Sequence, residues 1–355
     1  MANRTTIQRP PERQTKQTQH LNSTPFQHLK KLPTTFYMSQ CVLHKHEILI
    51  CGGFYQRVCY SYHILKNEYK FICEYPRDVR LHGHCVVKLV DNNKHSNEIT
   101  LLSFGSDWDG KKKHTLIMKY VSVWSNASKK SNELNNYNQW IPLTDNQNHP
   151  IIIGRDNDVY QGMRALIGGR NNNFIFDLNT FQFIKHNNIP SDDTWYHCFV
   201  SNSENGQGQE MIKTDEKKIN KIDIAPLFRY GYIYVNDAIL FFGGLNNFNV
   251  SRSLHKYSIR ENKWTTLKNI LPSPLYNCVA VLSEEDNDIH IIGGQYNKKD
   301  IASTHIKTKV RIWDISQLSK NEIKFIIQNW VRSLQIKFGW INDFDQIIFK
   351  YSRMK

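Results

Sequence analysis

A short apolar run that ends in glycine recurs along this chain, and it constrains the fold more than any other feature. Copies with a glycine pair lie at residues 48–53, 165–169, 239–244 and 290–294, and residues 101–106 (LLSFGS) hold a degraded copy. A strand-sized apolar run followed by glycine indicates a buried strand whose end needs a positive φ or a close backbone approach. Recurrence at a spacing of roughly 50 residues predicts an architecture built from repeated units.

A second repeated pattern follows the glycine-ended runs. Residues 59–76, 173–190 and 255–272 align almost residue for residue, each with two aromatic positions seven residues apart and a closing proline. The aromatic pairs are Tyr62 with Tyr69, Phe176 with Phe183, and Tyr257 with Trp264. Period-two alternation on either side of a tight turn predicts an antiparallel hairpin in each copy.

The start of each unit carries a cysteine before a β-favouring apolar pair. The copies SQCVLH, GHCVVK, YHCFVS and YNCVAV contain Cys41, Cys85, Cys198 and Cys278. We interpret these cysteines as one repeat position that holds a small buried thiol where units pack together. The chain has no C-x-x-C motif, and its first 20 residues have no apolar core of the kind that a secretory leader needs. We therefore expect free thiols and a cytoplasmic protein.

Each unit thus contains four antiparallel strands, and it resembles the kelch repeat. The resemblance rests on the glycine pairs, on the position of Tyr62 and Tyr257, and on the position of Trp264, and it covers residues from about 25 to 315. It implies an all-β fold, a kelch-type β-propeller in which four-stranded blades surround a central channel.

We expect six blades, one of them degenerate. They lie near residues 36–76, 80–143, 148–190, 194–228, 229–272 and 274–318. The blade at 194–228 is the degenerate one, because its middle is polar and has the composition of a loop. The last unit lacks a fourth strand, and residues 25–33 have the aromatic-to-proline spacing of that strand. The N-terminal segment is therefore predicted to close the last blade and to cover its open edge.

The two ends of the chain differ from the repeats. Residues 1–24 are predicted to be a basic, disordered tail, and residues 319–355 a helical appendage. Ser319 and Glu322 form a capping-box pattern, which is followed by apolar residues at three- and four-residue spacing. This amphipathic helix has two alternative fates: it docks on the side of the propeller or it binds a partner.

The charge balance bears on possible partners. Lys and Arg number 46 against 32 Asp and Glu, a net charge of +14, and much of the excess lies near the two ends. Such a balance allows non-specific binding of polyanions, which is one alternative function. No apolar run is long enough to span a bilayer, and no sequence-reading nucleic-acid motif is present. We expect a monomer that uses neither a membrane nor a specific nucleic acid.

The loops after the glycines are predicted to leave one face of the propeller, and they carry aromatic and basic side chains. These candidate binding residues are Phe54, Tyr55, Arg57, Trp108, Lys111, Arg170, Asn246, Phe248, Arg252, Tyr296 and Lys298. Aromatic and Arg side chains commonly anchor interfaces. Our first hypothesis is therefore a non-enzymatic interaction module that binds a protein or an acidic peptide through this face. The alternative for these residues is that the aromatic side chains pack beneath their own loops.

An enzymatic alternative comes from the same resemblance, because kelch propellers include copper-dependent oxidases. His82 with His84, and His44 with His46, have a spacing that a metal could use, but both pairs lie on or beside first strands rather than on converging loops. Asp107-x-Asp109-Gly110 lacks the remaining ligands of a calcium loop and is interpreted as an Asp-Gly turn. We therefore expect no catalytic residues, no metal and no cofactor.

Overall fold

The computed structural model describes residues 25–89, 98–125, 136–154, 159–160, 162, 174–177, 182–186, 228–246, 249–283, 285–297, 300–313 and 328. In this part of the chain the named elements are β-strands and one short 3₁₀ helix, η1 (Val310–Ile312). The all-β prediction is confirmed. No helix within these ranges has the length and apolar character needed to cross a membrane.

Four of the sheets have four antiparallel strands each. The strands of the first two sheets are β2 (Gln40–His44), β3 (Glu47–Gly53), β4 (Gln56–His63) and β5 (Glu68–Glu74), then β6 (Cys85–Lys88), β7 (Glu98–Ser106), β8 (Lys113–Val121) and β9 (Ile141–Pro142). The other two contain β12 (Gly231–Val235), β13 (Ala238–Phe242), β16 (Leu254–Ser258) and β17 (Lys263–Thr266), then β18 (Val279–Ser283), β19 (Asp288–Ile292), β20 (His305–Lys309) and β1 (Gln27–His28).

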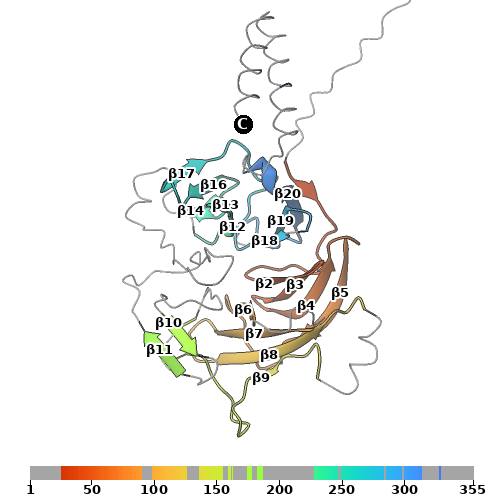
Figure 1. The fold of residues 1–355 in the computed structure, drawn as a ribbon, viewed down its shortest axis with the longest axis vertical. Helices are drawn as coiled ribbons and strands as arrows, with labels where there is room; N and C mark the ends of the chain where they lie inside the picture. Colours follow the sequence, from red (N-terminus) through yellow and green to blue (C-terminus); the bar gives the residue numbers. More distant parts are fainter. Residues whose placement is uncertain are drawn as a thin grey trace, which may run out of the picture.

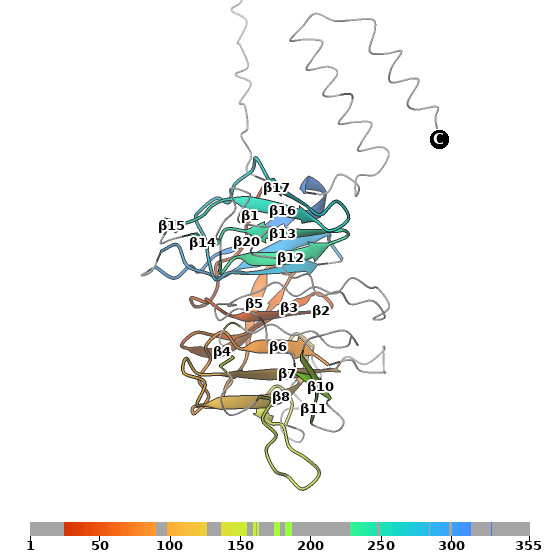
Figure 2. The same cartoon turned by 90° about the vertical axis from the view of Figure 1, so that its left-hand side faces the viewer.

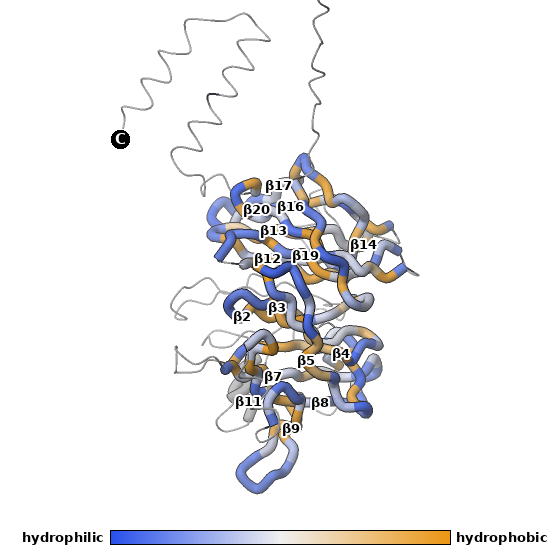
Figure 3. The backbone as a smooth tube through the Cα atoms, turned by 90° about the vertical axis from the view of Figure 1, so that its right-hand side faces the viewer, coloured by the Kyte–Doolittle hydropathy of each residue, from blue (hydrophilic) through white to orange (hydrophobic). Residues whose placement is uncertain are grey.

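The four sheets follow one another as the blades of a propeller (Figures 1 and 2). Their first strands lie side by side in the order β12, β18, β2, β6, so these strands line the axis. Within each sheet the chain then moves outward strand by strand. Apolar residues concentrate within the strands, whereas the loop after β9 is hydrophilic (Figure 3).

The aromatic pairs predicted from the sequence are direct cross-strand neighbours. Tyr62 faces Tyr69 in β4 and β5, and Tyr257 faces Trp264 in β16 and β17. The third copy forms the hairpin β10 (Phe174–Asp177) and β11 (Gln182–His186), in which Phe176 pairs with Phe183. The hairpin prediction is confirmed in all three copies. Two short strands, β14 (Leu245–Asn246) and β15 (Asn249–Val250), form a further pair in a loop.

The count of six blades is not confirmed. The described residues contain four complete blades and the β10–β11 hairpin. Apart from Phe228 and Gln328, the degenerate blade near 194–228, the tail 1–24 and the helix at 319–355 lie outside the described residues. These three predictions stay predictions.

The cysteine motif is not one structural position, so this part of the sequence interpretation is wrong. In three blades we compared the residue of the first strand that pairs with the residue directly before the first glycine of the second strand. These first-strand residues are Gln40, Cys85 and Val279. Cys85 occupies this position, whereas Cys41 lies one residue after it and Cys278 one residue before it. Cys198 lies outside the described residues. Neighbouring strand residues point to opposite faces, so each one-residue offset sends the thiol to the other side of its sheet. Cys41, Cys85 and Cys278 all still pack in apolar clusters.

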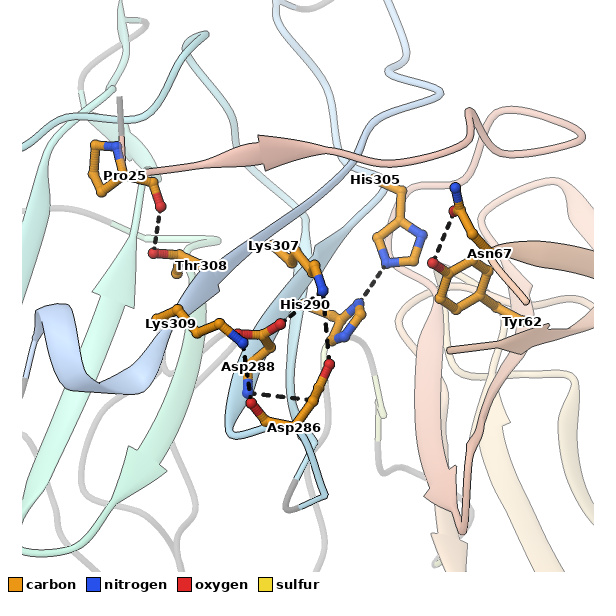
Figure 4. A network of polar contacts seen from close by, with 10 residues as sticks. All are labelled: Pro25, Tyr62, Asn67, Asp286, Asp288, His290, His305, Lys307, Thr308 and Lys309. Atoms are coloured by element: carbon orange, nitrogen blue, oxygen red, sulfur yellow. Dashed lines mark hydrogen bonds and ion pairs between the residues drawn. The ribbon is translucent and has the colours of Figure 1, made fainter. Parts of the chain in front are cut away.

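The N-terminal strand closes the last blade, as predicted. Gln27 pairs with Lys307, so β1 becomes the outermost strand beside β20 (Figure 2). The hydroxyl of Thr308 donates to the carbonyl of Pro25 at 2.8 Å (Figure 4). Phe26 is buried, and its ring centroid lies 5.7 Å from that of Trp313. Segments from the two ends of the described chain therefore hold one sheet together.

A polar chain crosses the seam between this last blade and the first. The imidazoles of His290 and His305 are 2.9 Å apart through Nδ1 and Nε2, and His305 Nδ1 lies 2.6 Å from the Tyr69 hydroxyl (Figure 4 shows the two histidines). The Tyr69 hydroxyl also reaches the backbone carbonyl of Lys30 at 3.2 Å. One direction satisfies every donor along this path: His290 donates to His305, His305 to Tyr69, and Tyr69 to the carbonyl. The chain thus joins β19, β20, β5 and the N-terminal segment.

Charges surround this chain on the β19–β20 side. Asp288 is buried, and its carboxylate lies 2.7 Å from the ammonium groups of both Lys307 and Lys309. Burial, above all, lowers the pKa of His290 to about 4 and holds the pKa of His305 well below its usual value. Both histidines are therefore neutral at pH 7.

The next seam, between the first and second blades, also contains a buried polar group. The Glu47 carboxylate accepts hydrogen bonds from the hydroxyls of Ser61, at 2.6 Å, and Tyr120. The indole of Trp124 donates to Ser61 at 2.9 Å. Burial, followed by the charge of Glu47, raises the pKa of Tyr120. A hydrogen bond from the second blade thus satisfies the buried carboxylate of the first.

Truncation tests the closing strand. A chain that starts at Thr34 lacks β1 and Phe26, so it exposes the edge of β20, and we expect a much lower melting temperature than for a chain that starts at Leu21. The single change Phe26→Ala should cost about 3–5 kcal/mol, the usual cost of truncating a buried Phe. The matched change His28→Ala, on an exposed residue of the same strand, should leave the melting temperature almost unchanged. Equal melting of the two truncated chains would contradict closure by β1.

Acid should weaken the histidine seam. The folded-state pKa of His290 lies below the unfolded value of about 6.5, so the unfolded chain binds the proton first as the pH falls. The contribution is complete above pH 6.5 and is lost as the pH falls toward 4, at about 1.4 kcal/mol for each unit of pKa difference. Chemical denaturation at a series of pH values should show a smaller pH dependence for His290→Gln than for the unchanged protein. His28→Gln, on the exposed strand β1, is the control and should keep the full dependence.

Candidate binding face

The glycine pairs set the contact between consecutive blades. Gly52, Gly243 and Gly293 all have φ between +56° and +66°, as expected for the first glycine of each pair. A Cβ on Gly243 would collide with the backbone carbonyl of Leu275, and one on Gly293 with that of Phe36. On Gly52 it would collide with the side chain of Leu81. Every one of these neighbours belongs to the linker that leads into the next blade, so a glycine is required at the same place three times.

Backbone hydrogen bonds complete this contact. The N–H of Gly244 donates to Leu275 at 2.8 Å, and the N–H of Gly294 donates to Phe36 at 2.7 Å. The interblade linkers and the loops after the glycines therefore lie at the same end of the propeller. We call this end, made by the loops after the glycines and by the linkers before β2, β6, β12 and β18, the loop face.

Four rings from three segments meet on the loop face. The ring centroid of Phe54 lies 5.2 Å from that of Tyr37, 4.0 Å from that of Tyr55 and 4.5 Å from that of His82. Tyr37 belongs to the linker before β2, and His82 to the linker before β6. Tyr55 has a φ of 57° and is 81% exposed. We call these four residues the aromatic cluster: Phe54 packs in its middle, and Tyr55 reaches into solvent.

Trp108 stands on the neighbouring loop, between β7 and β8, and is 72% exposed. The loop is closed by hydrogen bonds between the backbones of Asp107 and Lys112, at 3.1 Å, and of Gly110 and Asp107, at 3.3 Å. The carboxylate of Asp107 also accepts the N–H of Lys112 at 3.0 Å. These bonds confirm the interpretation as an Asp-Gly turn, and they hold the exposed indole on a structured loop.

Two of the predicted arginines, Arg57 and Arg252, lie on described segments, and each makes contacts within its own blade. Arg57 donates from Nη1 to the carbonyl of Tyr75 at 3.0 Å and pairs with Glu74 at 3.1 Å. Arg252 donates from Nε to the carbonyl of Leu271 at 2.8 Å. In both blades the same two backbones are also joined by an N–H to carbonyl bond of 2.8 Å. Each arginine therefore ties its own strand to the segment that follows the outer strand.

The remaining candidates divide into two groups. Lys111 is exposed but lies 2.9 Å from the carboxylate of Asp109, and this contact lowers the pKa of Asp109. The hydroxyl of Tyr296 lies 2.6 Å from that of Thr304, and its ring is 38% exposed. Asn246 lies in β14, and its side chain is outside the described part. The candidates Arg170, Phe248 and Lys298 also lie outside it.

The linkers carry further side chains at the loop face that the sequence pattern did not reveal. Tyr37, His82 and Arg229 lie on linkers at the loop face, and the carbonyl of Arg229 accepts the N–H of Asn277 at 2.7 Å. Burial, followed by the positive charge of Arg229, lowers the pKa of His82. An even number of strands per blade places each linker at the same end as the glycines, and this topological rule could have identified the three residues in advance.

The histidine pairs are not arranged as a metal site. His84 is buried and its Nε2 lies 2.9 Å from the carbonyl of Cys51, while His82 packs edge-on against Phe54. The His44 ring packs edge-on against the Tyr120 ring, whereas His46 pairs with Glu285. Within the described residues no group of three or more His, Cys, Asp or Glu side chains is placed to hold a metal ion.

Comparison with known proteins supports the repeat assignment. Two similar curated proteins are both called "Kelch repeat and BTB domain-containing protein 2": one from cowpox virus (strain GRI-90 / Grishak), 24% identical over 168 residues, and one from horsepox virus, 23% identical over 167 residues. Each match covers 42% of this chain and 29% or 30% of the relative, so the similarity spans less than a third of the relatives' length. Together with the four-stranded blades, these similarities confirm the predicted kelch-type repeat.

The structure titled "Structure of YjhT" aligns with a TM-score of 0.49 and 12% identity over 80% of this chain and 97% of that chain. No protein-family profile matches the sequence.

The partners of Arg57 lead to a test of its structural role. Arg57→Ala removes the charged donor from the Tyr75 carbonyl, and we expect a loss of about 1.5 kcal/mol, the lower end of the range for charged hydrogen bonds because the side chain is partly exposed. The matched change Lys111→Ala, on the same face, should leave stability almost unchanged, as is usual for exposed ion pairs. Urea denaturation measures both. Equal effects would show that Arg57 does not hold its blade together.

Proposed function

We propose that this chain is a non-enzymatic protein-interaction module that binds a protein partner through its loop face. The observation that carries the proposal is the pair of large aromatic side chains, Tyr55 and Trp108, that extend into solvent from adjacent blades. Both stand on loops held by the hydrogen bonds and ring contacts described above. Rigidly mounted, exposed aromatic side chains are the type that fill pockets on a partner at low entropic cost.

The aromatic side chains contribute more to this proposal than the basic ones. Arg57, Arg252 and Lys111 each have a partner inside the chain, so a ligand that bound them would compete with existing contacts. An acidic peptide therefore has less support than a partner that presents apolar side chains. The relatives named for kelch repeats are consistent with an interaction role, but their names state no partner.

Proximity labelling in the native cell, with quantitative comparison of variants, tests the proposal. The double change Tyr55→Ala and Trp108→Ala should reduce labelling of specific partners by at least tenfold, since each lost aromatic anchor commonly costs more than 1 kcal/mol. The melting temperature should hardly change, because both side chains are exposed. The control is Leu65→Ala, a residue that is 69% exposed in the turn between β4 and β5, at the other end of the blades.

Two results would count against the proposal. Partners that remain with the double variant and are lost with Leu65→Ala would place binding at the opposite end of the propeller. Partners that remain with every variant would show that binding depends neither on Tyr55 and Trp108 nor on Leu65. In either case the fold would stand, because it does not depend on Tyr55 or Trp108.

A further inference from the structure

Three cysteines form a row across the first blade. Cys51 faces Cys59 in the pairing of β3 with β4, and Cys59 faces Cys73 in the pairing of β4 with β5. Directly opposite residues of antiparallel strands point to the same side of the sheet, so the three thiols share one side. All three are free and buried in one apolar cluster with Met118 and Trp140 of the second blade. We call these three residues the thiol row, and it lies in the seam between the first two blades.

The spacing within the thiol row suits a disulfide bond. Opposite Cα atoms of antiparallel strands lie about 4.5–5.5 Å apart, within the range of about 4.4–6.8 Å that disulfides span. Cys41, on the same sheet, provides the contrast. It pairs with Ile50, the neighbour of Cys51, so its thiol points to the other side of the sheet. A bond within the row therefore needs no shift of the strands, whereas Cys41 has no such access.

The neighbours of Cys59 make it the most acidic thiol of the row. The indole Nε1 of Trp140 donates to its sulfur at 3.4 Å. Burial raises the pKa of the Cys59 thiol, but hydrogen bonds from Cys51, Cys73 and Trp140 outweigh burial, and this pKa lies well below its usual value. The hydrogen bond with Cys59, followed by burial, holds the pKa of Cys51 well above its usual value. Because the thiolate is the reactive form, Cys59 is the nucleophile and Cys51 keeps its proton beside it.

Cys51 is better placed than Cys73 to bond with Cys59. The sulfur of Cys73 lies 3.7 Å from that of Met118, across the seam, so its thiol is turned toward the second blade. Cys51 and Cys59 instead enclose residues 52–58, the end of the hairpin that carries Tyr55. A bond between them would close the neck of this loop.

We propose that Cys51 and Cys59 form a reversible disulfide in response to a peroxide, at the neck of the loop that carries Tyr55. The Cys59 thiolate attacks one oxygen of hydrogen peroxide, the O–O bond breaks, and hydroxide leaves behind a sulfenic acid on Cys59. The sulfur of Cys51 then attacks the sulfur of Cys59. The S–S bond forms, the S–O bond breaks, and the proton of Cys51 leaves with the hydroxyl group as water. Peroxide thus takes two electrons from the two thiols.

The oxidant has to reach a buried seam. Hydrogen peroxide is small and uncharged, and β5, which carries Cys73, is the outermost strand of its sheet. An outer strand is held by one neighbour only, so local opening of β5 admits the oxidant. A thiol reductant reverses the bond by the same route.

Peptide mapping of the full chain tests the bond. After exposure to hydrogen peroxide, free thiols are blocked with N-ethylmaleimide and the protein is digested with trypsin without reductant. Cleavage after lysine and arginine places the three thiols on separate peptides, 46–57, 58–66 and 71–77. We expect peptide 46–57 linked to peptide 58–66, and loss of this linkage after treatment with dithiothreitol. Unmodified thiols, a linkage of 58–66 to 71–77 in its place, or only sulfinic and sulfonic acids would overturn the proposal.

Three variants assign the roles within the row. Cys41→Ala and Cys73→Ala should leave the linkage intact, because neither thiol takes part. Cys51→Ala removes the second thiol, so dimedone should trap the sulfenic acid on Cys59. Equally fast bonding of Cys59 to Cys73 in this variant would show that Cys51 has no special role. A melting curve establishes that each variant is folded, and the mapping of the unchanged chain decides the proposal if one is not.

Hydrogen exchange measures what the bond does to the loop. The amides of residues 52–58 should exchange more slowly in the oxidised protein and return to the original rate after dithiothreitol, because the bond removes open states of the loop. The matched control is the equivalent neck between β13 and β16, where Phe242 faces Leu254 and no thiol pair is present. Its Gly243 amide should exchange at the same rate before and after oxidation. An equal change at both necks would contradict a local bond.

These tests are independent of the proposed binding face. The mapping and the exchange need no partner, so their failure leaves the role of Tyr55 and Trp108 untouched. Conversely, unchanged partner labelling in the Tyr55 and Trp108 variant would count against the loop face and not against the disulfide.

Discussion

The contact between a glycine and the next linker is the constraint on which the rest of the structure depends. At Gly52, Gly243 and Gly293 the backbone has a positive φ, and the next linker occupies the space where a Cβ would be. Only glycine meets both conditions at low cost. The repeated contact fixes how each blade follows the previous one, and it also brings loops and linkers of different blades together. The aromatic cluster exists for this reason, since Tyr37, Phe54 and His82 lie on three segments that the glycine contact gathers.

The seams between blades combine apolar clusters with a few buried polar groups. A purely apolar seam could slide by one residue at modest cost, whereas a buried Glu47 or His305 must meet its partner or lose a hydrogen bond in a low-dielectric setting. Glu47 meets Ser61 and Tyr120, and His305 meets His290 and Tyr69. These hydrogen bonds fix how neighbouring blades are aligned, whereas the burial of apolar side chains supplies most of the stability. At the closing seam the same polar chain also reaches the N-terminal segment, so closure by β1 is linked to the alignment of the first blade.

Local patterns predicted the parts of the fold that depend on local geometry. The hairpins and their aromatic pairs follow from alternation and turn spacing, and β1 follows from an unfilled place in the last blade. The cysteine motif failed because strand register is set by pairing with the glycine-ended strand, which the motif does not encode. The roles of Arg57 and Arg252 were also invisible, since a sequence does not show that a guanidinium lies beside a particular carbonyl. The aromatic cluster and the His290–His305–Tyr69 chain join residues far apart in sequence, and they emerge only when the blades are packed.

The two ends of the blades differ for a topological reason. The glycine contact occupies the backbone at the loop face, so the loops beyond it can vary without disturbing the blades, and large exposed rings such as Tyr55 cost little stability there. At the other end of the blades, turns connect the first strands directly to the glycine-ended strands. At the loop face the basic side chains are engaged within the chain, since Arg57, Arg252 and Lys111 each have a partner there. A protein partner on the loop face would therefore contact exposed rings more readily than basic groups, and it could do so without disturbing the contacts that hold the blades together.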